Sequence, residues 1–95
     1  MTTKNGPGQL ARSLHRQAAT MFLDEEPTWE KYNAGIGLLE QAIALGEVDA
    51  NEWLGAAYEY GLGVSPDLRR AFKHYKLAAE NGNGGAEYCL SLIHI

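Results

Sequence analysis

Three histidines and one cysteine are the residues of this chain that could bind a metal ion or act as a nucleophile. They are His15, His74, Cys89 and His94. The histidines do not share the i,i+4 spacing that places two imidazoles on one helix face, and a single cysteine cannot form a Cys-x2-Cys pair. Cys89 and His94 are five residues apart, which is a poor spacing for two ligands on a helix. We therefore expect no metal site, and we expect Cys89 to be a small buried thiol.

Two further patterns resemble chemical sites, namely clustered carboxylates and a Gly-x-Gly turn. Acidic residues gather at 24–26 and at 47–52. A catalytic pair needs partial burial to separate its two pKa values, whereas neighbouring acids in turns are normally solvated. Gly61-Leu62-Gly63 lacks the preceding strand of a dinucleotide-binding loop, and Pro66 stands where the third glycine would be. We expect no catalytic residues and no cofactor.

The elements that would position these residues follow from an internal repeat with an offset of 36 residues. Identical residues coincide at this offset: Ala42 with Ala78, Gly46 with Gly82, Ala50 with Ala86, and Leu54 with Leu90. Self-similarity at such a period is typical of helical repeat proteins. The chain is therefore interpreted as one helical-repeat domain over 1–95. Its parts are a flexible N-terminus (1–8), a degenerate repeat (14–49), a full repeat (50–85) and a partial repeat (86–95).

Apolar spacing within these units predicts helices and no strands. In both complete units the second helix carries small or apolar residues at spacings of 3, 1, 3, 3 and 1. Thr28, Asp49 and Ser65 are candidate N-caps, and Gly46 and Gly82 are candidate helix ends. Three aromatic residues are expected to fill the space between the helix layers: Tyr58, Phe72 and Tyr75. The pattern predicts antiparallel helix pairs that stack, because one pair cannot bury its apolar stripe alone.

The most specific pattern runs from residue 50 to residue 86. It reads Ala50-x3-Leu54-Gly55-x2-Tyr58-x2-Gly61-x-Gly63-Val64-x2-Asp67-x3-Ala71-x3-Tyr75-x2-Ala78-Ala79-x2-Gly82-x3-Ala86. This pattern resembles the Sel-one-like repeat, a relative of the tetratricopeptide repeat. Residues 14–49 resemble a degenerate copy with Asp24-Glu25-Glu26-Pro27 in place of the Gly-x-Gly-Val turn, and beyond Leu90 the pattern fails. The resemblance implies an all-α, right-handed α-solenoid of antiparallel helix pairs, a tetratricopeptide-like superhelix of about two and a half repeats.

The resemblance also implies a function, that of a protein–protein interaction or scaffold module without catalytic activity. The alternatives are a structural spacer from a longer repeat array and, in a different class, a small regulatory enzyme or hydrolase. Candidate partner-binding residues lie on the first helix of each pair, outside the core pattern: Arg12, Arg16, Glu52, Trp53 and Tyr60. Trp53 fits two interpretations equally, an exposed interface anchor or packing against the neighbouring unit.

The charge distribution favours a protein or peptide partner that is basic or aromatic. A net charge of −4, from 8 basic and 12 acidic residues, does not favour nucleic acid or an anionic membrane. Residues 24–59 hold nine acids and one base, whereas residues 68–79 hold four bases and no acid. No apolar stretch is long enough for a bilayer and no secretory signal is visible. Exported relatives carry cysteine pairs that this chain lacks, so we expect a cytoplasmic protein.

Overall fold

A computed structural model describes residues 7–93 of the chain, in which five α-helices and one 3-10 helix follow one another. The elements are α1 (Pro7–Phe22), α2 (Trp29–Ala44), η1 (Val48–Ala50), α3 (Asn51–Tyr60), α4 (Leu68–Glu80) and α5 (Gly84–Leu92). Helices account for 77% of these residues, and no strand occurs among them. The all-α prediction is confirmed. The end of the partial repeat, His94 included, lies outside the described residues.

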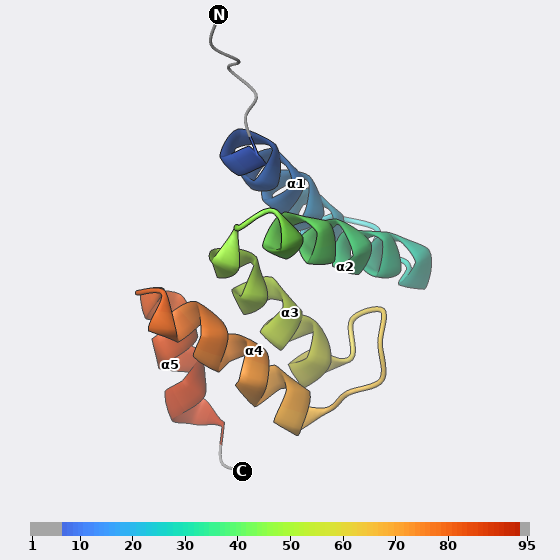
Figure 1. Cartoon of the computed structure of the whole chain (residues 1–95). Coiled ribbons are helices and arrows are strands. Elements are labelled where there is room, and N and C mark those ends of the chain that lie inside the picture. The colour runs from blue at the N-terminus through green and yellow to red at the C-terminus, as the bar shows by residue number, and fades with distance from the viewer. Residues whose placement is uncertain (1–6, 94–95) are drawn as a thin grey trace, which may run out of the picture.

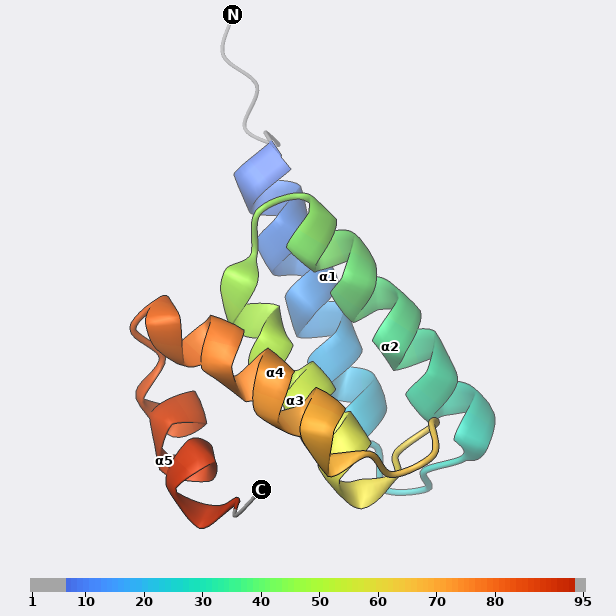
Figure 2. The ribbon, with the colours of Figure 1, turned by 60° about the horizontal axis from the view of Figure 1, so that its bottom comes forward.

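The helices form antiparallel pairs that stack, as the resemblance implied. Figure 2 shows α1 beside α2 and α3 beside α4, while α5 follows α4 as the first helix of the next unit. The two pairs meet where α2 and η1 lead into α3 (Figure 1). The chain is thus an α-solenoid of helix pairs. One boundary differs from the prediction, because α1 already begins at Pro7, inside the segment 1–8 that was expected to be flexible.

The N-caps differ from the prediction at two of three helices. Thr28 caps α2 as predicted, since its hydroxyl accepts from the backbone N–H of Lys31. Ser65 does not cap α4; the cap is Asp67, whose Oδ1 accepts from the backbone N–H groups of Arg69 and Arg70 at 3.1 and 3.2 Å. Asp49 is not a cap either, because it lies inside η1, which runs directly into α3.

The Asp67 cap leads to a test with a matched control two residues away. We expect Asp67→Ala to lower the free energy of unfolding by about 1 kcal/mol, the usual cost of losing an N-cap. Ser65→Ala should change it by less than about 0.5 kcal/mol, because Ser65 is exposed and precedes the helix. Urea unfolding of both variants measures the difference. An equal loss in the two variants would contradict the assignment of the cap.

One apolar cluster crosses the boundary between the first two units. Its buried members come from α1, α2 and the start of the next pair: Ala18, Phe22, Ile36, Leu39, Ala42, Ala50, Leu54 and Ala57. Phe22 is the central aromatic residue, because its ring stacks on Tyr32 at 5.6 Å and on Trp53 at 5.4 Å between centroids. A single core shared by α1, α2 and α3 is what makes the two units one domain.

The second cluster is built around Tyr75, which is 1% exposed. Its ring lies on Gly55 of α3 and packs with small and apolar residues of α4 and α5, among them Ala71, Ala78 and Ala86. The Tyr75 hydroxyl donates to Glu59 Oε1 at 2.7 Å, and burial, with Glu59, raises the pKa of this tyrosine far above its usual range. The prediction of a buried Tyr75 with Tyr58 beside it is confirmed.

Phe72 does not fill the space between the helix layers as predicted, since its side chain is 37% exposed. The reason lies in the helix periodicity: positions 71, 75 and 78 form the buried face of α4. Position 72 projects to the side of that face, which leaves the Phe72 ring partly exposed.

Candidate partner-binding surface

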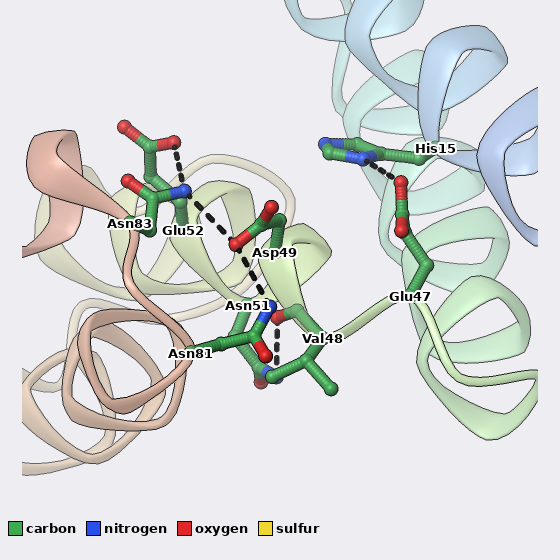
Figure 3. Close-up of polar contacts among 8 residues, drawn as sticks. All are labelled: His15, Glu47, Val48, Asp49, Asn51, Glu52, Asn81 and Asn83. Atoms are coloured by element: carbon green, nitrogen blue, oxygen red, sulfur yellow. Dashed lines mark hydrogen bonds and ion pairs between the residues drawn. The ribbon is translucent and has the colours of Figure 1, made fainter.

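Polar bonds tie the first helix of each pair to the segment that follows the pair. In the first unit, His15 Nδ1 lies 3.0 Å from Glu47 Oε2. Asn83 is the residue 36 positions after Glu47. Its amide nitrogen donates to Glu52 Oε1 at 3.1 Å and, more weakly, to Asp49 Oδ1 at 3.4 Å (Figure 3). In both units, therefore, the first helix is bonded to the residue at which the following unit begins: α1 to Glu47, before η1, and α3 to Asn83, before α5.

The bonds of Asn83 also orient Glu52. The Asn83 side-chain oxygen accepts from the backbone N–H of Ala86 at 2.8 Å, so Asn83 caps α5 while its nitrogen holds the Glu52 carboxylate. Glu52 Oε2 lies so near Gly85 that a Cβ there would be 2.5 Å from it. The carboxylate is thus kept at the beginning of α5, where the helix dipole favours a negative charge.

Three of the five candidate site residues line one hollow, of about 210 Å³, between α3, α4 and α5. They are Glu52, Trp53 and Tyr60, and Ala56, Tyr75 and Cys89 complete the lining. Tyr60 is 67% exposed, Trp53 and Cys89 are half-buried, and Tyr75 forms the floor. Glu52, Trp53, Ala56 and Tyr60 project from one side of α3, at spacings of 1, 3 and 4 residues.

The other two candidates lie apart from this hollow. Arg12 and Arg16 are exposed on α1 and line a separate, open depression of about 280 Å³ together with His15, Ala19 and Glu47. The sequence grouped all five residues because they share the first helices of the pairs. The structure brings three of them together and leaves the two arginines on the neighbouring unit.

One segment of the chain, which contains α3 and α4, matches a known protein family. Residues 48–83 match the model of the Sel1 repeat. The chain contains a Sel1 repeat. Neither the curated proteins nor the solved structures that were searched gave a significant match. The matched segment comprises η1, α3 and α4 and ends on Asn83, the cap of α5. Sel1 repeats are helical, tetratricopeptide-like repeats that are generally protein-interaction modules without catalytic activity.

Trp53 of the Sel1 repeat packs against the neighbouring unit, which is one of the two interpretations that its position allowed. One side of the indole stacks on Phe22 of the preceding unit at an interplanar angle of 18°. The same side chain also lines the hollow on α3. Because Phe22 restricts the orientation of the ring, Trp53 presents a fixed aromatic wall rather than a free side chain.

The hollow of the Sel1 repeat is acidic. The ion pairs among residues 7–93 join Lys31 to Asp24 and Arg70 to Asp67, and a protonated His15 would form a third with Glu47. None of these pairs involves Glu52 or Glu59, and none joins the bases of α4 to the acidic stretch 24–59. The pKa of the Cys89 thiol is raised, first by burial and further by the negative charges of Glu52 and Glu59.

Four residues at this surface were not predicted as site residues, namely Ala56, Tyr75, Asn83 and Cys89. Of these, Tyr75 and Cys89 were expected in the core. Tyr75 belongs to the core and also forms the floor of the hollow. For Asn83, the available signal was its position one residue after the helix-ending Gly82, where an Asn commonly caps the next helix.

Between residues 7 and 93, no three His, Cys, Asp or Glu side chains gather in a group that could hold a metal ion. Over the same residues, every helix is too short or too polar to cross a bilayer.

Proposed function

We propose that the chain is a docking module that binds a segment of a protein or peptide partner on the α3 side of its Sel1 repeat. The observation that supports this function is the convergence of Glu52, Trp53 and Tyr60 on one hollow. Aromatic side chains at the centre of a contact surface commonly contribute most of the binding energy. The single cysteine, Cys89, is free, and the proposed location remains the cytoplasm.

The size of the hollow favours a side chain of a larger partner over a small-molecule ligand. Its volume of about 210 Å³ is below the ~300–1,000 Å³ of typical small-molecule pockets. One inserted side chain would fill it, and the rest of the partner would lie on the neighbouring surface. The acidic surroundings and the aromatic walls are suited to a basic or aromatic residue at that position.

Tyr60 offers the cleanest test of this surface. Trp53 is less suitable, because it stacks on Phe22 and its truncation would also weaken the core. An array of short random-sequence peptides would be probed with the full chain, and affinities of the retained peptides measured. We expect Tyr60→Ala to weaken these affinities by about fivefold or more, because an exposed aromatic anchor contributes about 1 kcal/mol or more.

The matched control is Trp29→Ala, which removes another exposed aromatic residue, 57% exposed at the start of α2 and outside the hollow. This variant should bind the same peptides as the wild-type chain does, and both variants should keep the wild-type helical signal. If the peptides bind the Tyr60→Ala variant as tightly as they bind the wild type, this surface is not the binding site. A structural spacer would then be the better description of the chain's function.

A further inference from the structure

The lining of the hollow combines a carboxylate with aromatic surface and contains no base. Glu52 stands at one wall, Trp53 and Tyr60 provide two aromatic walls, and Tyr75 forms the floor. Faces of tryptophan and tyrosine attract cations through their quadrupoles, most strongly when the cation is partly removed from water. A carboxylate beside such rings supplies the opposite charge. This combination matches a cation better than it matches an apolar side chain.

Glu52 forms no ion pair among the described residues, although Asn83 and the beginning of α5 hold its carboxylate in place. Its Oε1 accepts from the Asn83 amide, which is a neutral donor. The ion pairs formed by residues 7–93 leave its charge without a cationic partner. Because Asn83 and Gly85 restrict the carboxylate, little side-chain entropy remains to be lost when a cation binds.

A second carboxylate adds to the negative potential. Glu59 Oε1 accepts a hydrogen bond of 2.7 Å from the hydroxyl of Tyr75, the residue that forms the floor of the hollow. The charges of Glu52 and Glu59 both act on the thiol of Cys89, which lines the same hollow. A positive group that entered here would therefore meet attraction from two acids and repulsion from no lining residue.

We propose that the hollow receives a lysine or arginine side chain of the partner segment. The charged end would lie against Glu52, and the aliphatic stem would lie on Trp53 and Tyr60, since both side chains cover apolar surface with their stems. This inference rests on the proposed function, because it names the residue that the docking surface selects. It decides between the basic and the aromatic partner, in favour of the basic one.

The test compares peptides that carry a cationic residue with peptides that carry a neutral residue of similar shape. Peptide pools that share a random background would carry one fixed central residue: lysine, norleucine, arginine, citrulline, phenylalanine or leucine. We expect the wild-type chain to bind the lysine and arginine pools about fivefold or more tightly than the norleucine and citrulline pools. This preference should shrink in ~1 M salt, where the Debye length falls to ~3 Å.

Glu52→Gln is the decisive variant, because glutamine keeps an oxygen for the Asn83 bond and removes the charge. It should abolish most of the preference for the lysine and arginine pools over the norleucine and citrulline pools. Glu40→Gln is the matched control, since it removes one exposed acid on α2 and should leave the preference intact.

The outcomes separate this inference from the function on which it rests. If the phenylalanine or leucine pools bind best and still depend on Tyr60, the docking function stands and the cationic ligand is wrong. If Glu40→Gln lowers the preference as much as Glu52→Gln does, long-range charge and not the hollow selects the ligand, and the inference is again wrong. If no pool binds the wild type better than Tyr60→Ala, the proposed function fails as well.

Discussion

Replacing Tyr75 by alanine should lower the free energy of unfolding by about 3–5 kcal/mol, the cost of truncating a buried aromatic side chain. Tyr75 is 1% exposed and is the largest fully buried side chain of the described chain. Tyr75 belongs to α4 and packs against both α3 and α5, so its truncation leaves a cavity among the three helices. Such a loss is a large part of the ~5–15 kcal/mol that holds a typical domain together.

Phe72→Ala is the control on the same helix, because it also removes an aromatic ring but at a site that is 37% exposed. We expect it to cost about 1 kcal/mol or less. Tyr75→Phe keeps the ring and loses the bond to Glu59, which should cost about 1–2 kcal/mol. Thermal unfolding followed by circular dichroism measures all three. A wild-type melting temperature for Tyr75→Ala would contradict the packing of α5 and α4 on α3.

Gly55→Ala should lower the free energy of unfolding by about 1–2 kcal/mol, although alanine is the better helix former by ~1 kcal/mol. A Cβ on Gly55 would lie 2.6 Å from two ring carbons of Tyr75. The ring cannot move aside easily, because its hydroxyl is bonded to Glu59 and the ring is buried. The steric cost therefore exceeds the gain in helix propensity.

The opposite sign is expected for Gly37→Ala, the same substitution inside α2. A Cβ at Gly37 would have nothing within 4 Å, so the change should stabilise the chain by about 0.5–1 kcal/mol through backbone entropy and helix propensity. Urea unfolding of the two variants in parallel measures the contrast. Stabilisation by both substitutions would show that α3 and α4 do not approach closely at Gly55.

The sequence by itself determined the helical class, the 36-residue repeat and the antiparallel pairing. These features depend on local periodicity and on helix ends, and local patterns are what a linear sequence records. Gly46 and Gly82 illustrate this, because the left-handed backbone that each adopts, with φ of 103° and 89°, is the conformation that a glycine helix end predicts. The burial of Tyr75 was predictable for the same reason, since it lies on the small-residue face of α4.

Only the tertiary structure decided how the candidate site residues group. Arg12 and Glu52 both occupy first helices, yet they line different hollows because each unit is rotated and displaced from the next. The stacking of Trp53 on Phe22 and the bond from Asn83 to Glu52 are contacts between different elements. The exposure of Phe72 depends on which neighbour covers that side of α4. Residue types and spacing define the face on which a side chain lies, whereas the geometry of the neighbouring unit decides what that face meets.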